Sequence, residues 1–359
     1  MNVTELLACP GMAGGIWPDT DGVPINAHGG GMLKEGNLFY WYGEHKVAGK
    51  RGNLAWVGVH VYISDDLVHW RDAGIAFDIR DGGPLQPGCV IERPKVVRNP
   101  AGKFVMWFHL ERDCTYSDAR QAVAVADRPE GPFRLLWHGR PNPGVWPLNT
   151  PPELREPARI EAARREMPTL PYDANPLTPQ LSVLGMDLET GQQSRDMTVF
   201  VDDDRTAYVV YASEKNSTIH LAELDSGYTG FTGRYWRLFP WRWMEAPVLF
   251  KRNGKYYFIG SDCTGWAPNA ARSAVADHLA GPWTELGNPA ADAGGDTTYG
   301  AQGTFALQLA PDEIIFMADR WNPENAIDGR YLWLPVEWDG ERPILKAPVR
   351  PLPAGAEYP

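Results

Sequence analysis

The chain has 359 residues, including 37 glycines, 32 prolines and 15 tryptophans, and it carries a net charge of −11. Abundant turn-forming and aromatic residues favour an all-β repeat fold, while the negative charge excludes nucleic acid and anionic membranes as expected partners. The four cysteines show neither metal-binding nor disulfide-dense spacing, so we expect free, buried thiols in a reducing compartment.

The start of the chain, MNVTELLACP, contains no basic segment and only a very short apolar run, which is not the pattern of a signal peptide. No apolar run reaches the length of about 18 residues that a membrane span needs. These features predict a cytoplasmic protein without a membrane partner. An oligosaccharide, which is neutral and rich in hydroxyl groups, is compatible with the negative charge.

Five β-hairpins recur along the chain. Each has an apolar run that opens on a polar residue, a polar turn, and a second apolar or aromatic run, which is the pattern of two antiparallel strands. The paired runs are residues 28–33 and 38–44, 92–97 and 104–108, 195–200 and 207–211, 243–250 and 256–261, and 302–307 and 314–318. In the fourth hairpin Pro247 lacks a backbone donor, so it belongs near a strand start or an edge.

A second signal follows four of the hairpins. It consists of an acidic turn and an aromatic anchor, twice with Gly-Pro between them, and we expect it to end a third strand and begin a fourth. It covers residues 64–70, 126–133, 224–231 and 276–283, whereas the fifth unit has VEWDG at 336–340 in that place. Units of about four short strands predict a five-bladed β-propeller with uneven spacing.

The largest irregularity lies between the second and third units, at about residues 140–193. Its first part is rich in proline, and residues 153–166 have the composition of a short helix. Long loops in compact domains often serve as lids or binding loops. We therefore expect a Pro-rich, partly helical insertion between blades 2 and 3, which either shapes the binding site or decorates the surface.

The repeat brings five polar residues to equivalent positions. In a propeller the first strand of each blade lines the central channel, and these strands run parallel to one another. The polar residues that open the five first strands are therefore expected to form a ring at one mouth of the channel: His28, Glu92, Asp196, Glu245 and Gln302. Three carboxyl groups at the start of apolar strands are hard to explain by packing.

Three carboxyl groups around one pocket suit glycoside hydrolysis, in which one protonated acid donates to the leaving oxygen while another group activates water. Glu245 opens an apolar, aromatic strand, where a carboxyl favours the protonated form that a general acid needs. In inverting enzymes the two carboxyls lie roughly 6.5–9.5 Å apart, which leaves room for water. Candidates for stacking on sugar rings are Trp41, Tyr42, Trp107, Trp243 and Trp266.

Several motifs resemble glycoside hydrolase family 43, and most closely its exo-β-1,3-galactanase-like branches. They are AHGGG at 27–31, YGE at 42–44, ERPKV at 92–96, SRDMT at 194–198, EAP at 245–247 and Gln302, with further matches at 261–272 and 330–335. The resemblance extends from about residue 27 to residue 345. It implies a five-bladed propeller and an inverting mechanism, and we expect residues 1–359 to form this one catalytic domain without an accessory carbohydrate-binding module.

The resemblance also implies catalytic roles. It makes Glu245 the general acid and Asp196 the group that tunes the pKa of this acid and orients it. Most of the family has an Asp as general base on the first blade, but this chain has NAHG at 26–29. In the galactanase-like branches a Gln matching Gln302 handles the water, with a Glu matching Glu92 close by. Because a neutral amide is a poor base, both residues stay candidates.

Expected substrate-binding residues are Glu44, Arg93, His28, Glu214, Asn216, Trp41 and Trp266. Glu44, Glu214 and Asn216 enter by similarity as ligands of sugar hydroxyls. His28 lies near the propeller axis, where some members of the family hold a calcium ion or water. We expect no cofactor and no metal ligand, with a structural calcium ion at the axis left open.

The leading hypothesis is an inverting exo-glycosidase that acts on terminal β-galactosides of the β-1,3-galactan or arabinogalactan type. Short oligosaccharides are the expected substrates, because no binding module is expected after the fifth unit. Another specificity within family 43, such as α-L-arabinofuranosidase or galactofuranosidase, is the first alternative. The second is a non-catalytic carbohydrate-binding propeller, which the missing first-blade Asp favours. The oligomeric state is not predicted.

Overall fold

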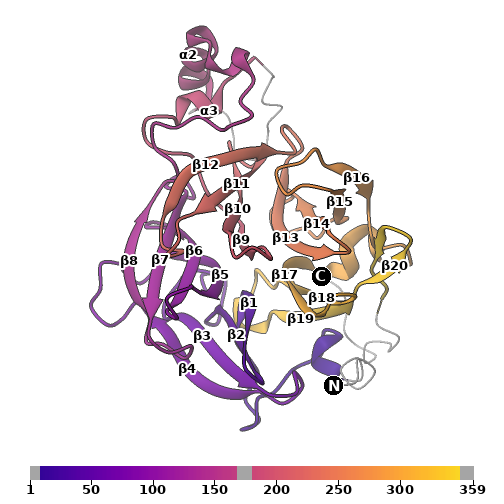
Figure 1. Ribbon diagram of the computed structural model, residues 1–359. Coiled ribbons are helices and arrows are strands. Elements are labelled where there is room, and N and C mark those ends of the chain that lie inside the picture. Colours follow the sequence, from indigo (N-terminus) through magenta and orange to yellow (C-terminus); the bar gives the residue numbers. More distant parts are fainter. Residues whose placement is uncertain (1–8, 168–179, 348–359) are drawn as a thin grey trace.

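The five expected hairpins are the inner strand pairs of five sheets arranged around one axis in the computed structural model, which describes residues 9–167 and 180–347 (Figure 1). Blade 1 contains β1 (His28–Glu35), β2 (Leu38–Glu44), β3 (Gly58–Ser64) and β4 (Arg71–Asp78). Blade 2 contains β5 (Val90–Arg98), β6 (Phe104–Glu111), β7 (Arg120–Ala126) and β8 (Arg134–Gly139). Blade 3 contains β9 (Met197–Val201), β10 (Ala207–Ser213), β11 (Thr218–Leu224) and β12 (Phe231–Leu238). Blade 4 contains β13 (Met244–Arg252), β14 (Lys255–Asp262), β15 (Arg272–Ala276) and β16 (Thr284–Gly287).

Blade 5 differs from the expected pattern, because its sheet has 3 strands, β17 (Gln302–Ala310), β18 (Glu313–Arg320) and β19 (Arg330–Pro335). The N-terminal segment covers its outer edge: η1 (Pro10–Met12) contacts β19, and Ala13 pairs with Leu332. The residues that departed from the repeat form a separate hairpin of β20 (Glu337–Asp339) and β21 (Arg342–Ile344). Covering an edge strand with a distant segment completes the ring and blocks unwanted strand pairing.

The second recurring signal lies where the sequence predicts it, between the third and fourth strands of blades 1 to 4. Its aromatic anchors Trp70 and Phe133 are buried. These anchors fix the outermost strand of a blade to its neighbours, so the repeat visible in the sequence is a packing repeat as well.

The five first strands contact one another in a closed ring, β1 to β5, β9, β13, β17 and back to β1. The core is distributed between neighbouring blades, because successive side chains of a strand point to opposite faces. On β6, for example, Met106 and Phe108 pack toward blade 1, whereas Trp107 packs toward blade 3. This arrangement holds the starts of the first strands rigidly at one mouth of the ring.

The insertion between blades 2 and 3 is partly helical, as the sequence predicts. It contains η2 (Pro152–Arg155), α2 (Pro157–Glu166) and α3 (Val183–Met186), and the two α-helices project from the rim beside β12 (Figure 1). Residues 168–179 of the insertion lie outside the described residues.

No helix in the two described ranges is long and apolar enough to cross a membrane. All four cysteines are free thiols. Cys9 and Cys89 are buried as expected, and Cys263 is partly exposed. The expectation of buried thiols is wrong for Cys114, which is exposed in the loop after β6.

Candidate active site

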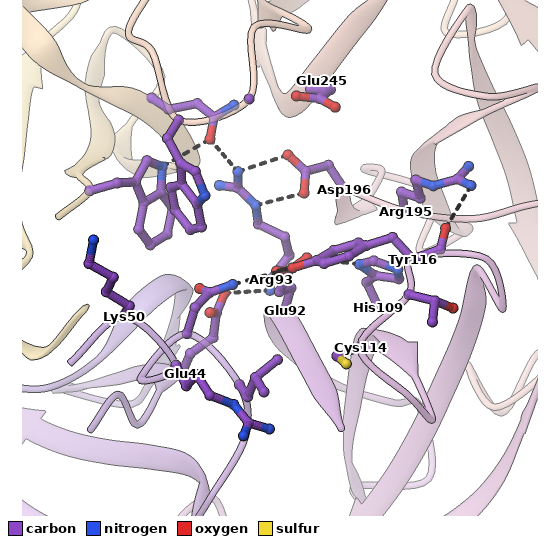
Figure 2. A pocket seen from close by; sticks show the side chains of 18 residues that line it. Glu44, Lys50, Glu92, Arg93, His109, Cys114, Tyr116, Arg195, Asp196 and Glu245 are labelled. Atoms are coloured by element: carbon purple, nitrogen blue, oxygen red, sulfur yellow. Dashed lines mark hydrogen bonds and ion pairs between the residues drawn. The ribbon is translucent and has the colours of Figure 1, made fainter. Parts of the chain in front are cut away.

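A cavity of about 680 Å³ lies at the mouth of the ring where the first strands begin (Figure 2). Side chains from all five blades or their connecting loops line it. Its polar lining includes the carboxyl groups of Glu44, Glu92, Asp196 and Glu245, the cationic groups of Lys50, Arg51, Arg93 and Arg195, the imidazole of His109, and the amides of Asn53 and Gln302. Its aromatic lining consists of Tyr116, Trp266 and Trp321. None of the described residues of the insertion at 140–193 lines it.

The structure brings most of the expected site residues together. Seven of them line the cavity: Glu44, Glu92, Arg93, Asp196, Glu245, Trp266 and Gln302. Asn216 does not line it, but its side-chain amide donates a hydrogen bond to Oε1 of Glu245. The ring of polar strand starts is therefore present on blades 2 to 5.

Three expected substrate-binding residues do not line the cavity. His28 is fully buried, and its ring stacks on Tyr331 with 5.1 Å between ring centroids. Trp41 is buried in the core between blades 5 and 1. Glu214 is buried too, and Arg237 donates to its two oxygens at 2.6 and 2.9 Å. In each case packing against a neighbouring element takes the side chain away from the mouth.

Of the five aromatic candidates for sugar stacking, Trp266 alone lines the cavity, and it is 47% exposed. Its ring meets Trp321 edge to face, with 6.2 Å between the ring centroids. Tyr42 and Trp107 are buried between blades, and Trp243 packs against the small core under α2. Blade packing, rather than ligand binding, explains those aromatic residues.

Glu92 and Glu245 are presented by the same backbone device. Each is followed by a residue with positive φ and then by proline, with φ of +57° at Arg93 and +51° at Ala246. A β-bulge interrupts the pairing at both places, between Glu92 and Lys95 and between Glu245 and Val248. The bulge accommodates a proline without a ladder hydrogen bond, and it turns the preceding glutamate toward the mouth.

Glu245 is held in its protonated form around neutral pH. Burial raises the pKa of Glu245 to about 8, and the negative charge of Asp196 contributes in the same direction. The backbone N–H of Ala246 donates to Asp196 at 3.0 Å, which ties the two carboxyl groups together. Such an acid can donate a proton at neutral pH.

The amide of Asn216 reaches Glu245 from a tight left-handed turn. Glu214, Lys215 and Asn216 have φ of +49°, +59° and +63°, which is uncommon for residues other than glycine. The buried ion pair between Glu214 and Arg237 fixes this turn. Glu214 therefore helps to hold the turn from which Asn216 contacts Glu245.

Arg93 contacts residues of three other blades, Asp196, Gln302 and Glu44. Its guanidinium donates to both oxygens of Asp196 at 2.8 and 3.1 Å and to Oε1 of Gln302 at 2.6 Å. Its backbone N–H donates to Glu44 at 2.9 Å. Bidentate pairing fixes the plane of the Asp196 carboxylate as well as its position.

Glu92 is held in its ionised form. Burial acts to raise its pKa, but the hydrogen bond and charge of His109, together with the charge of Lys46 and the hydrogen bond of Tyr116, outweigh burial and lower the pKa of Glu92 to about 2. His109 Nδ1 lies 3.0 Å from Oε2 of Glu92, and the hydroxyl of Tyr116 donates to Oε1 at 2.6 Å. Glu92 therefore accepts hydrogen bonds but does not donate them.

Both ends of the Gln302 amide are occupied. Its Oε1 accepts from Arg93 and also from the indole N–H of Trp321 at 3.0 Å. Its Nε2 donates to the hydroxyl of Ser261 at 2.9 Å. An amide oxygen has two lone pairs, so both are used, whereas each oxygen of Glu92 accepts one hydrogen bond from a side chain.

A buried lysine, Lys95, lies two residues after Arg93. The ammonium group of Lys95 donates to the backbone oxygens of Gly29 at 3.0 Å and Arg93 at 3.2 Å. Burial lowers the pKa of Lys95 to about 7. Lys95 thus links β5 to the start of β1.

The ring of His28 is fully buried, and neither of its nitrogens has a hydrogen-bond partner among the residues that the structure describes. Burial and the nearby charges of Lys46 and Arg330 lower the pKa of His28 to about 3. Within residues 9–167 and 180–347, no group of three or more His, Cys, Asp or Glu side chains is placed to hold a metal.

Sequence reasoning missed several residues that line the cavity, among them His109, Tyr116, Arg195 and Trp321. A signal for two of them was available. The second strand of an antiparallel hairpin ends beside the start of the first, so His109 on β6 pairs with Glu92, and Trp321 directly follows β18. Tyr116 lies in a loop, and no repeat or spacing indicates where a loop residue points.

Comparisons with known proteins identify the family of the chain. Residues 178–304 match the family described as glycosyl hydrolases family 43. A family 43 β-1,3-galactosidase solved with galactodeoxynojirimycin has a TM-score of 0.86 and 43% identity, covering 93% of this chain and 98% of that one. No curated protein sequence matches.

Two exo-β-1,3-galactanases are also similar. The enzyme from Phanerochaete chrysosporium, solved with β-1,3-galactotriose, has a TM-score of 0.74 and 31% identity over 93% of this chain and 66% of that one. The enzyme from Clostridium thermocellum has a TM-score of 0.73 and 34% identity, covering 93% of this chain and 64% of that one. The chain therefore belongs to glycosyl hydrolase family 43 and is a glycoside hydrolase built on a five-bladed β-propeller.

Proposed function

We propose that this glycoside hydrolase removes terminal β-galactosyl units, with inversion, from oligosaccharides of the β-1,3-galactan or arabinogalactan type. The observation that carries the chemistry is the pair of carboxyl groups held in opposite protonation states, Glu245 with a pKa of about 8 and Glu92 with a pKa of about 2. One proton donor and one ionised acceptor at the same cavity are what hydrolysis of a glycosidic bond needs. The activities of the similar solved enzymes, a β-1,3-galactosidase and two exo-β-1,3-galactanases, support a β-1,3-linked galactose as substrate.

In this proposal Glu245 donates its proton to the glycosidic oxygen as the bond to the anomeric carbon breaks. Asp196 keeps that proton on Glu245 through its negative charge, and Asn216 orients the carboxyl group. As the departing sugar leaves, Glu245 becomes a carboxylate and is reprotonated from solvent. General acid catalysis of this kind contributes about 10²–10⁴-fold in rate.

On the opposite side of the sugar, Glu92 orients the attacking water and accepts its proton. It keeps free lone pairs after bonding His109 and Tyr116, whereas the oxygen of Gln302 is already used twice. A pKa of about 2 makes Glu92 a weak base that is always ionised, so its main contributions are orientation and negative charge near the developing oxocarbenium ion. Gln302 instead holds Arg93 and Trp321 in place.

The lining of the cavity suits a terminal sugar. Glu44 and Arg93 line it and carry polar atoms for the hydroxyls of such a sugar. Trp266, which is partly exposed, is suited to stacking on the next sugar ring.

The test is to follow hydrolysis of β-1,3-galactobiose and of aryl glycosides by proton NMR. The panel includes β-galactopyranosides, β-galactofuranosides and α-L-arabinofuranosides. We expect turnover of the β-1,3-galactoside with α-galactose as the first product, because water attacks the face opposite the leaving group. β-Galactose as the first product would refute inversion, and turnover of only the furanosides would assign the other specificity.

A further inference from the structure

His109 has a carboxyl group at each ring nitrogen. Its Nδ1 lies 3.0 Å from Glu92 and its Nε2 lies 2.9 Å from Glu111, and the ring is 1% exposed. A neutral imidazole has one donor and one acceptor nitrogen, and an ionised carboxylate can only accept. Two hydrogen bonds to two carboxylates therefore require an imidazolium.

Glu111 is buried and accepts hydrogen bonds at both of its oxygens. It is 0% exposed, and its Oε2 accepts the backbone N–H groups of Asp118 at 2.7 Å and Ala119 at 2.9 Å. Backbone donors aimed at a carboxylate favour its charged form. Burial acts to lower the pKa of His109, but the hydrogen bonds and charges of Glu111 and Glu92 outweigh burial and raise the pKa of His109 to about 9.

We propose that His109 and Glu111 form a positioning pair that keeps Glu92 ionised and fixes the direction of its carboxylate. The inference rests on the proposed role of Glu92 in handling the water. Neither residue acts on the sugar in this scheme. Glu111 holds the charge on His109, and His109 holds Glu92 from the strand beside it.

Other charged and titratable groups face Glu92 and act on it less directly: Glu44, Lys46, Arg93, Tyr116 and Glu245. Lys46 is paired with Glu44, and its charge also lowers the pKa of Glu92, whereas Arg93 is paired with Asp196. Tyr116 donates a neutral hydrogen bond. His109 is the one cation that bonds Glu92 directly within the described residues, and its ring faces Glu92, Glu111 and Tyr116.

His109→Asn tests the pair, because the amide nitrogen of Asn occupies the place of Nδ1 and keeps a donor without the charge. The pH dependence of kcat/KM is measured on β-1,3-galactobiose. Glu92 must be ionised, so loss of the charge moves the acidic limb to higher pH, by about 1–3 units. The alkaline limb stays in place. A fall of kcat/KM by the same factor at every pH, with no movement of the acidic limb, would show a merely structural role and overturn the proposal.

Glu111→Gln is the matched variant, since it keeps an acceptor for Nε2 but removes the charge that favours the imidazolium. We expect the acidic limb to move in the same direction and by a similar amount, because the ring beside Glu92 becomes neutral. A smaller movement would still support the pair. An unmoved acidic limb in both folded variants contradicts it.

Nitrogen NMR of histidine-labelled protein gives a readout that does not depend on activity. The signal that disappears in His109→Asn is assigned to His109. It should show two protonated ring nitrogens in the unmodified protein at pH 7.5 and a neutral ring in Glu111→Gln. A neutral His109 in the unmodified protein overturns the pair while leaving the proposed function untouched. An imidazolium in a protein that hydrolyses no galactoside would instead overturn the proposed function alone.

Discussion

Glu92 on blade 2 and Glu245 on blade 4 occupy the same place in the repeat, yet their surroundings drive their pKa values in opposite directions. Both open a first strand, both precede a left-handed residue and a proline, and both lie at a bulge. The residue opposite each glutamate on the second strand differs: His109 faces Glu92, and Ser261 faces Glu245. A cationic partner lowers the pKa of one carboxyl, and burial near Asp196 raises that of the other.

The two glutamates show that the position of a carboxyl group and its protonation have different structural causes. The backbone device of strand start, bulge and proline delivers a carboxyl to the mouth of the ring, and it does so twice with the same local sequence pattern. The second strand and the neighbouring blade then decide what that carboxyl does. Repetition thus supplies position, and the non-repeated neighbours supply the chemistry.

The largest expected effect separates the two glutamates by their dependence on the leaving group. Glu245→Gln should lower kcat on β-1,3-galactobiose by about 10²–10⁴-fold, but on a dinitrophenyl galactoside by less than about tenfold, because that leaving group needs no proton. Glu92→Gln should impair both substrates by similar factors. If both variants lose the same fraction of kcat on both substrates, Glu245 and Glu92 do not have the separate roles of proton donor and water ligand. Circular dichroism spectra and melting temperatures control for folding.

The pH profile of the unmodified enzyme is the next test. Glu245 is an acid with a raised pKa, so its protonated form is fully present below that value and lost above it. We expect kcat/KM to fall about tenfold per pH unit above a pH of about 8. An alkaline limb near the ordinary glutamate pKa of about 4.3 would mean that burial does not protect the proton.

Asp196→Asn tests which charges set the alkaline limb of the pH profile. Removing the negative charge of Asp196 takes away a repulsion that favours the protonated Glu245, and it leaves the positive charge of Arg93 without its partner. Both changes move the alkaline limb to lower pH. The acidic limb, which belongs to Glu92, should stay where it is, and a shift of both limbs together would argue against independent control.

Asn216→Ala should have a smaller effect confined to the acid side. The lost hydrogen bond to Glu245 is worth about 1 kcal/mol, which corresponds to roughly fivefold in kcat on galactobiose. The dinitrophenyl galactoside should be nearly indifferent. A larger loss on the activated substrate would place Asn216 on the sugar instead of on the acid.

Trp266→Ala should leave the pKa values of Glu92 and Glu245 unchanged. Loss of a stacking face at the exposed side of the cavity is expected to raise KM by about 2–10-fold, without moving either limb of the pH profile. Trp41→Phe is the matched control: it removes volume from the core between blades 5 and 1, so it should lower the melting temperature and leave KM unchanged.

The sequence predicts the ring because strand starts are visible in it. The polar residue before each apolar run marks where a first strand begins, and this places Glu92, Asp196, Glu245 and Gln302 at one mouth. The same rule fails for His28, which is packed against Tyr331. Side-chain direction at a strand start depends on the local bulge and on the neighbouring blade, and neither is written in the repeat.

The residues that determine the protonation of Glu92 and Glu245 were the hardest to predict from the sequence. His109 is in an ordinary apolar strand by pattern, and its role follows only from the register that pairs it with Glu92. Tyr116 and the turn at Glu214 to Asn216 reach the site through loop conformations with positive φ. The polar residues that open the first strands indicate where the site lies. The protonation of Glu92 and Glu245 depends on contacts between strands and blades, which the sequence pattern does not show.

The most direct test of the account is to titrate the two carboxyl groups themselves by carbon NMR of glutamate-labelled protein, with Glu245→Gln and Glu92→Gln used to assign the signals. At pH 6 the account predicts a protonated Glu245 that ionises near pH 8, beside an ionised Glu92 that shows no protonation down to pH 4. Two carboxyl groups that titrate together near pH 4–5, or a Glu92 that protonates at higher pH than Glu245, would contradict it.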